Sequence, residues 1–269
     1  MNPQSVKLKV LDLFSGIGMF SYGLEKTSLY KTVAFCENDT KCQQVLKKHW
    51  PSVYCYSDIS KLEWYGDYLY SEECETAWFT DVDIVCGGFP CQDLSIANRN
   101  GDGLKGSRSG LWSEYKRLIL GIKPKGVIIE NVSALLNRGL ATILCDLDSI
   151  GYDAEWHCIT AKYFGAYHER DRVFILAYNR SIRGSGFKPL QCVEKIGQGR
   201  EGCQETLQQI YDNPFRRSGS VPEPLLRRMD VGNTVDLDRL KQIGNTVYWP
   251  IVKQLGDHLY ENINSFGKV

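Results

Sequence analysis

The chain has no net charge and no long apolar run, and both absences narrow its class. Its 269 residues hold 32 Lys and Arg against 32 Asp and Glu, and 43% of them are hydrophobic. Because the charges balance, any basic surface that binds nucleic acid or a membrane must be local. The opening residues MNPQSVKLKV lack the apolar core of a signal peptide, and no apolar run reaches the length of a membrane span. A soluble, cytoplasmic globular protein without a membrane partner is expected.

The cysteines lack the spacing of a metal site or a disulfide framework. Ten of them are scattered between Cys36 and Cys203, with no Cys-x-x-Cys pair and no clustering near the four histidines. Zinc sites and thioredoxin-like redox sites require such spacing, so neither is predicted. Reduced thiols and no bound metal are the expectation.

The first sixty residues predict a doubly wound α/β fold. An apolar strand, 8–14, runs into a turn with Gly16 and Gly18 and then into a helix. The turn lacks the full Gly-x-Gly-x-x-Gly, and alone it fits a tight structural turn as well as a nucleotide site. However, Glu37 ends a second strand about 20 residues later, and Asp58 follows a third. The carboxyl ends of parallel strands line one crevice, where ligands bind.

Strands and helices continue to alternate beyond this point. Strands are predicted at 31–36, 53–56, 84–86, 126–129, 154–162 and 172–178, and helices at 41–49, 111–121, 133–147 and 251–263. Residues 62–80 are aromatic and acidic, and they predict a helix or an insertion without chemistry of its own. The glycine-rich, basic segment 98–110 is either a surface loop or a lid that closes over a phosphate backbone.

The stretch DIVCGGFPCQDLS, residues 83–95, presents one thiol on a polar loop after an apolar strand. Gly87 and Gly88 allow a sharp turn and a close approach to a ligand. Pro90 restricts its own backbone and that of the preceding residue, so Cys91 follows at a defined angle. A nucleophile can be mounted in this way, although a lone Cys after a strand is more often a small buried hydrophobe.

Charged side chains mark two later strand ends. Glu130 follows the strand 126–129, and a carboxylate at the end of a buried strand is rare unless it has a specific role. The role is either chemical or structural, in which case Glu130 caps the next helix. Arg170 and Arg172 alternate, so on an extended segment they point to the same face and can orient a carboxylate or bind phosphate. A solvated surface pair is the alternative.

The composition changes after residue 178. From 179 to 236, Gly, Pro, Gln and basic residues dominate, as is typical of a small irregular domain with a backbone-contacting surface. An amphipathic helix, 251–263, must then pack on something, most simply on the first domain. The predicted fold class is α/β, a doubly wound and mostly parallel Rossmann-like sheet with a small irregular second domain. The predicted units are 1–178, 179–236 and a C-terminal segment, 237–269.

The order of these motifs resembles the DNA (cytosine-5) methyltransferase family, of prokaryotic or phage type, over nearly the whole chain. DLFSGIG (12–18) looks like the cofactor loop of the family, GGFPCQ (87–92) like its nucleophile motif and ENV (130–132) like its catalytic carboxylate motif. HERDR (168–172) stands where the family has Gln-x-Arg-x-Arg, and IGNTV (243–247) resembles its Gly-Asn-Ala-Val motif. Met19 and His168 depart from the family pattern.

The resemblance implies a DNA (cytosine-5-)-methyltransferase that uses S-adenosyl-L-methionine (SAM) and releases S-adenosyl-L-homocysteine. The Cys91 thiolate would attack carbon 6 of a cytosine flipped out of the duplex, which activates carbon 5. Glu130 would hold or protonate ring nitrogen 3. Arg170 and Arg172 would position Glu130 and the target nucleotide. Residues 1–178 would then be the catalytic, SAM-binding domain and 179–236 a short target-recognition domain.

The family resemblance also implies a cofactor pocket. Phe14 would stack on the adenine, Glu37 would bind the ribose, and Asp58 the adenine edge. Asn245 would bind the methionine end, and the backbone near Ile17 and Gly18 would complete the pocket. The implied pocket comprises Phe14, Ser15, Gly16, Ile17, Gly18, Glu37, Asn38, Asp58, Ile59, Pro90, Leu111, Asn245 and Val247.

Double-stranded DNA is the expected partner of a monomeric enzyme, within a restriction–modification system or in host or phage DNA modification. A cognate restriction endonuclease is a further expected partner. One alternative is a transfer RNA cytosine-5 methyltransferase, but the Cys-Phe-Thr tripeptide of that branch is absent. The other is a catalytically silent nucleic-acid-binding relative. It is disfavoured because Cys91, Glu130, Arg170 and Arg172 are all present.

Overall fold

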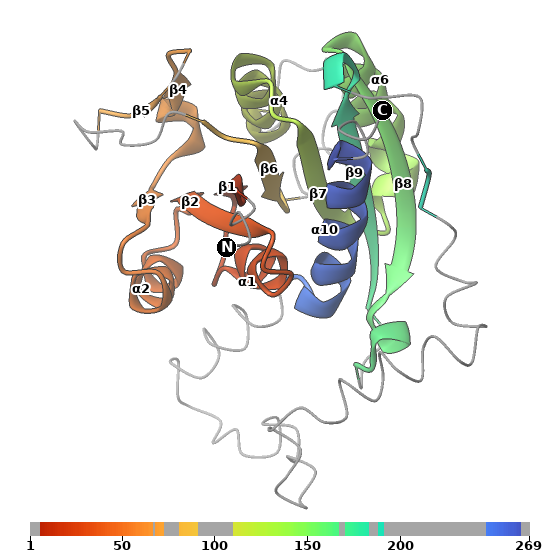
Figure 1. Cartoon of the computed structure of the whole chain (residues 1–269), viewed down its shortest axis with the longest axis horizontal. Coiled ribbons are helices and arrows are strands. Elements are labelled where there is room, and N and C mark those ends of the chain that lie inside the picture. Colours follow the sequence, from red (N-terminus) through yellow and green to blue (C-terminus); the bar gives the residue numbers. More distant parts are fainter. Residues whose placement is uncertain are drawn as a thin grey trace, which may run out of the picture.

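A seven-stranded sheet forms the centre of the computed structural model, which describes residues 6–66, 68–72, 81–90, 110–166, 170–182, 188–190 and 246–264. The strand order is β3-β2-β1-β6-β7-β9-β8 (Figure 1). The strands are β1 (Leu8–Leu13), β2 (Tyr30–Cys36), β3 (Tyr54–Tyr56), β6 (Ile84–Gly87), β7 (Gly126–Val132), β8 (Tyr152–Thr160) and β9 (Asp171–Asn179). The five strands from β3 to β7 are parallel, whereas β9 is antiparallel to both of its neighbours. The predicted α/β, mostly parallel fold is confirmed.

Helices cover both faces of the sheet. They are α1 (Met19–Glu25), α2 (Thr40–His49), α4 (Gly110–Ile122), α5 (Leu135–Arg138), α6 (Leu140–Ser149) and α10 (Trp249–Asn264). Val10 and Leu11 are neighbours in β1, yet Val10 packs in a cluster with α1 and α10 and Leu11 in a cluster with α4 and α6 (Figure 1). Side chains of a strand alternate between faces, so strands buried on both faces must be apolar throughout.

The C-terminal helix α10 packs closely on α1. An added Cβ atom at Gly23 would lie 2.8 Å from the Trp249 carbonyl oxygen and 2.8 Å from Val252 Cβ. At Gly256 it would lie 2.7 Å from Leu24 Cδ2. The absence of a side chain at Gly23 and Gly256 therefore allows α1 and α10 to approach each other closely. The predicted helix 251–263 is confirmed with a slightly earlier start, whereas the predicted division into three units stays a prediction.

Two predicted segments differ from the structure. Within 62–66 and 68–72, where a helix or an insertion is predicted, the chain forms a hairpin of β4 (Glu63–Trp64) and β5 (Leu69–Tyr70), so the helix alternative is wrong there. Gly66, with φ of +79°, allows the tight turn, and Tyr65 stacks on Tyr68 across it. The predicted helix 133–147 is interrupted at Gly139, between α5 and α6.

The strand β7 is longer than predicted and contains Glu130. Its pairing with β9 extends to Val132, because an antiparallel neighbour supplies hydrogen-bond partners along its whole length. The next helix, α5, has Ala134 at its N-cap and no side-chain cap. Capping of that helix by Glu130, the structural alternative, is therefore wrong. In the described part of the chain, no helix combines the length and the apolar character needed to cross a membrane.

Candidate active site

The five parallel strands end in one row, which gathers the polar residues that follow them. The aligned end residues are Tyr56, Cys36, Leu13, Gly87 and Ile129. The residues one position further along are Ser57, Glu37, Phe14, Gly88 and Glu130. This edge therefore carries side chains from three loops, the backbone of Gly88 and the strand residue Glu130, as the sequence predicts.

Glu130 forms a buried ion pair with Arg172. The residue is 9% exposed, and its Oε1 atom lies 2.8 Å from Arg172 Nε. Arg172 pairs with Val132 across β7 and β9, which makes it a diagonal neighbour of Glu130 on the same face. Burial raises the pKa of Glu130, and the nearby Arg172 and Arg170 only partly oppose this. The site therefore contains a carboxyl group that holds its proton more readily than an exposed glutamate.

The loop that precedes Cys91 is fixed against this carboxylate. A Cβ atom at Gly88 would lie 2.7 Å from Glu130 Oε2, so only glycine leaves room here. The side-chain amide of Asn131 donates a hydrogen bond to the Phe89 carbonyl oxygen at 3.0 Å. Pro90 is exposed at the end of this described stretch. Cys91 itself, the predicted nucleophile, lies outside the described residues.

The β1–α1 turn and Glu37 form the predicted cofactor loop. Ser15 Oγ donates to the Asp12 carbonyl oxygen at 2.6 Å, and Gly16 N donates to Glu37 Oε2 at 2.7 Å. An added Cβ at Gly16 would meet nothing within 4 Å, so the turn faces open space. Ile17 continues the turn towards Gly18, where an added Cβ would lie 2.7 Å from the Trp50 ring.

Phe14 adopts an unusual backbone conformation at this loop. Its φ is +52°, in the left-handed region that non-glycine residues rarely occupy. Its ring stacks on that of Tyr115 in α4, with centroids 6.2 Å apart and an interplanar angle of 17°. Such an outlier persists only where its surroundings determine it, and such outliers cluster at ligand sites.

The other predicted cofactor residues that the structure describes follow β2 or β3, begin α4 or precede α10. Asp58 accepts hydrogen bonds from Ser60 N at 2.9 Å and Ser60 Oγ at 2.7 Å, and these bonds lower its pKa. Ile59 is buried, and its carbonyl accepts a bond from Arg117 of α4. Asn38 is exposed after Glu37, Leu111 is half-buried at the start of α4, and Val247 is buried beside α1 and α10. Asn245 lies outside the described part of the chain.

These residues fit a nucleoside with a cationic tail. A carboxylate has about four acceptor positions, and Glu37 uses two of them for the amides of Gly16 and Asp39. The others remain for ribose hydroxyls. The ring of Phe14 offers an aromatic surface, and Asp58 adds a second carboxylate whose lowered pKa keeps it charged. The two carboxylates and the aromatic ring are therefore compatible with the nucleoside part of SAM.

Sequence reasoning assigned no role to two buried residues near this loop. Asp12 is fully buried in β1, and its Oδ2 accepts bonds from Ser21 Oγ at 2.7 Å and Ser21 N at 3.2 Å. It thereby satisfies the start of α1, whose N-cap Gly18 has no side chain for the purpose. Burial raises the pKa of Asp12 to about 7. Asp12 could have been found in the sequence as an aspartate within an apolar strand. Nothing in the sequence marks Tyr115, whose ring stacks on Phe14.

The sheet order and the position of the site at its carboxyl edge define a Rossmann-like α/β protein. Its fold is similar to that of the Entamoeba histolytica methyltransferase EhMeth, with a TM-score of 0.61 and 14% identity over 96% of this chain and 99% of that one. It is also similar to that of the S. pombe Dnmt2 methyltransferase, with a TM-score of 0.54 and 20% identity over 72% and 56%. At these identities the likeness establishes the fold alone.

Residues 8–217 match the family described as C-5 cytosine-specific DNA methylase, and the chain belongs to this family. It is 34% identical over 210 residues to the Type II methyltransferase M.Sau3AI of Staphylococcus aureus, over 71% of this chain and 48% of the relative. It is 35% identical over 178 residues to M2.BsuMI of Bacillus subtilis, over 63% and 42%. The chain thus spans about half the length of these relatives. The family resemblance drawn from the motifs is confirmed.

Proposed function

We propose that the protein is a SAM-dependent DNA (cytosine-5)-methyltransferase that acts on a cytosine turned out of the duplex. The observation that carries the proposal is Glu130, a buried carboxyl of raised pKa held by Arg172 beneath the loop that leads to Cys91. A carboxyl group whose pKa is raised takes up a proton more readily, and it can then donate that proton, or a hydrogen bond, to ring nitrogen 3 of cytosine. Family membership supports the same chemistry.

The residues have complementary roles in this chemistry. The Cys91 thiolate adds to carbon 6, and the electron pair displaced from the ring double bond makes carbon 5 nucleophilic. Glu130 stabilises the charge at nitrogen 3, and Arg172 keeps the carboxyl oriented, with Arg170 beside the target nucleotide. When bound, SAM supplies an electrophilic methyl group for carbon 5. Loss of the carbon-5 proton then returns an electron pair to the ring and expels the Cys91 thiolate.

The cofactor pocket would use the residues at the strand ends. Phe14 would stack on the adenine, Glu37 would accept hydrogen bonds from the ribose, and Asp58 would contact the adenine edge. Support comes from the stacked Phe14 ring, the free acceptor positions of Glu37 and the open space at Gly16. Asn245 would bind the methionine end. A segment within 179–236 would recognise the target sequence.

A restriction–modification setting follows from the relatives, which are named Type II methyltransferases. In that setting a cognate restriction endonuclease would recognise the same DNA sequence. Bisulfite sequencing of DNA from cells that express the protein would reveal the methylated site. Protection of that site against a nuclease would support the setting.

A labelling experiment tests the activity directly. Purified protein is incubated with tritiated SAM and either unmethylated duplex DNA or total transfer RNA, beside a Cys91→Ala variant. Label is expected in DNA with the wild type and not with the variant. Label in RNA alone would move the activity to transfer RNA, and no label in either would indicate a silent relative.

A trapping experiment tests the nucleophile. Duplex DNA that contains 5-fluorocytosine should form a stable covalent adduct, because fluorine at carbon 5 blocks the final elimination. The adduct should be absent with Cys91→Ala. An adduct that persists in this variant would show that another residue is the nucleophile.

A further inference from the structure

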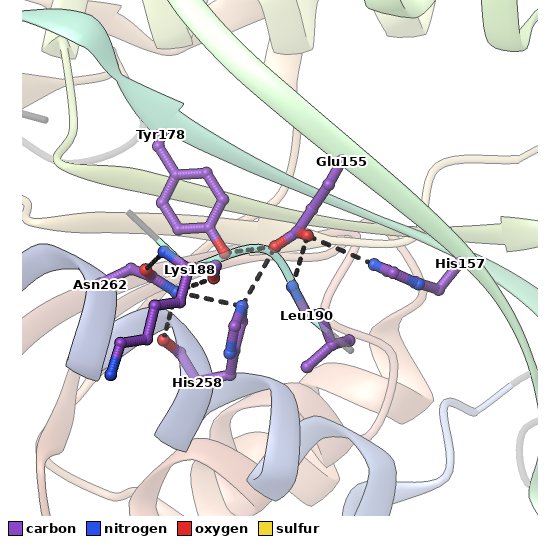
Figure 2. A network of polar contacts seen from close by, with 7 residues as sticks. All are labelled: Glu155, His157, Tyr178, Lys188, Leu190, His258 and Asn262. Atoms are coloured by element: carbon purple, nitrogen blue, oxygen red, sulfur yellow. Dashed lines mark hydrogen bonds and ion pairs between the residues drawn. The ribbon is translucent and has the colours of Figure 1, made fainter. Parts of the chain in front are cut away.

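A cluster of polar side chains, partly or fully buried, lies away from the site described above, on the face of the sheet covered by α10. Figure 2 shows its members together with Lys188 and Leu190. We call it the Glu155 cluster; it comprises Glu155 and His157 of β8, Tyr178 of β9, and His258 and Asn262 of α10. Two consecutive strands and the distant C-terminal helix therefore contribute to one polar network, which lies beside the apolar cluster on this face.

Glu155 is the centre of this network. Its Oε1 accepts a hydrogen bond from Tyr178 Oη at 2.7 Å and lies 3.2 Å from His258 Nε2. Its Oε2 accepts a bond from Leu190 N at 2.8 Å and lies 3.5 Å from His157 Nε2. Burial alone would raise the pKa of Glu155, but these bonds outweigh it and lower the pKa well below its usual range. A charged, fully engaged carboxylate is the result.

Asn262 binds the same segment from the other side. Its Oδ1 accepts a bond from Lys188 N at 2.9 Å, and its Nδ2 donates to the Lys188 carbonyl oxygen at 3.1 Å. The side-chain amide thus satisfies both backbone groups of one residue, as a neighbouring strand would (Figure 2). Asn262 is 7% exposed, and Leu190 packs its side chain against the adjacent apolar cluster. The backbone of 188–190 is therefore held by the buried Asn262 and the partly buried Glu155.

The Glu155 cluster lies close to the strand that contains Glu130. Glu155 pairs with Leu176 of β9, which pairs with Ile128 of β7, two positions before Glu130. Two strand spacings of about 4.8 Å place the cluster roughly 10 Å from the strand that carries the proposed catalytic acid. The chain continues from residue 190 into the rest of the predicted recognition domain, 179–236. The described residues contain no group of three or more His, Cys, Asp and Glu that could hold a metal.

We propose that Glu155 and Asn262 are positioning residues that anchor the chain at 188–190 and thereby set the placement of the recognition segment relative to Glu130. The recognition role rests on the proposed function, whereas the anchoring depends only on contacts within this chain. A recognition segment attached at a defined point loses less freedom when it binds DNA, so both affinity and discrimination between sites depend on the anchor.

The test uses Asn262→Leu, which keeps a similar volume and removes both bonds to Lys188. Glu155→Gln is the second variant, in case the first does not fold. Lys253→Gln is the matched control, because it breaks the Lys253–Asp257 pair on the same helix. Folding is checked by circular dichroism and by the affinity for SAM, which should stay within about twofold of the wild type because Phe14, Glu37 and Asp58 lie on other elements, at the carboxyl edge of the parallel strands.

Two measurements decide the proposal. Amide hydrogen exchange at Lys188 and Leu190 should become about tenfold faster or more in Asn262→Leu, because the bonds that close this segment are lost. With DNA, the KM should rise about tenfold at a nearly unchanged kcat, and discrimination against a site with one altered base should fall. Lys253→Gln should change neither quantity.

Unchanged exchange at these amides would overturn the anchor. Faster exchange with an unchanged KM and unchanged discrimination would show a merely structural attachment and would overturn the positioning role. Failure of the proposed function is separate, because it appears as wild-type protein that leaves no label in DNA. The exchange measurement would still decide the anchoring in that case.

Discussion

Arg172 Nε lies 2.8 Å from Glu130 Oε1, at the point where β7 and β9 meet the carboxyl edge of the sheet. The guanidinium does not cancel the effect of burial, since the pKa of Glu130 is raised even beside it. Burial makes it easier for Glu130 to take up the proton that it would share with cytosine, and the ion pair with Arg172 keeps the carboxyl group oriented. The pair also explains why β9, an antiparallel strand, belongs to the site.

Replacing Arg172 by Gln should raise the pKa of Glu130 further, because the nearest cation is lost. Breaking one partner of a buried pair should cost about 3–5 kcal/mol of the free energy of unfolding, or less if Glu130 becomes protonated. The pKa is measured by carbon-13 NMR of the carboxyl, and stability by urea unfolding. Lys253→Gln, at an exposed helical pair, should cost no more than about 0.5 kcal/mol. A pKa of Glu130 that stays constant would contradict the pairing.

Gly88→Ala should damage the site directly. The new methyl group would lie 2.7 Å from Glu130 Oε2, so the carboxylate or the loop must move. We expect a loss of about 1–3 kcal/mol of stability and a loss of methylation at least tenfold. Gly121→Ala in α4 is the matched control, because the nearest atom to an added Cβ there, Trp64 Cβ, lies at an ordinary contact distance of 3.4 Å. Equal methylation activities of the two variants would show that the close approach of Gly88 to Glu130 is not required for activity.

Asp12→Asn should change how stability depends on pH. Burial raises the pKa of Asp12 from 3.8 to about 7, so the folded protein binds more protons than the unfolded chain between these values. Its contribution therefore lowers stability as pH rises through this window, by roughly 4 kcal/mol at most, and levels off above it. Asparagine keeps an acceptor for Ser21 and does not ionise.

The stability difference between Asp12→Asn and the wild type should thus grow in favour of the variant from about pH 4 to about pH 7. Urea unfolding at a series of pH values measures it. A difference that is constant across this range would mean that Asp12 does not titrate there.

Tyr115 allows the ring and the hydroxyl to be tested separately. Among the residues that the structure describes, its buried hydroxyl has no hydrogen-bond partner, so Tyr115→Phe should leave stability unchanged or raise it by about 1 kcal/mol. Tyr115→Leu removes the ring that stacks on Phe14 and should weaken SAM binding about three- to tenfold. Calorimetry measures both affinities. Equal weakening by Phe and Leu would assign the hydroxyl, rather than the ring, to cofactor binding.

Local patterns in the sequence predicted much of the fold and part of the site. Apolar runs alternated with amphipathic segments, so most strands and helices were predicted within a few residues. Phe14, Glu37 and Asp58 each follow such a run, which predicted their gathering at one edge. The elements that were predicted wrongly depend on strand pairing, which the periodicity of a single segment does not reveal. The strand β7 reaches Val132 because β9 pairs with it, and the 63–70 hairpin depends on pairing between two short strands.

The sequence by itself determined the α/β class, the family and the order of the chemical motifs, because these depend on periodicity and on residues close together in the chain. The tertiary structure alone decided that Arg172 pairs with Glu130, that Tyr115 supports Phe14, and that a cluster around Glu155 fixes residues 188–190. The physical reason is that register, burial and the distance between charges arise only when remote segments pack together. These quantities set the pKa of Glu130, on which the proposed chemistry depends.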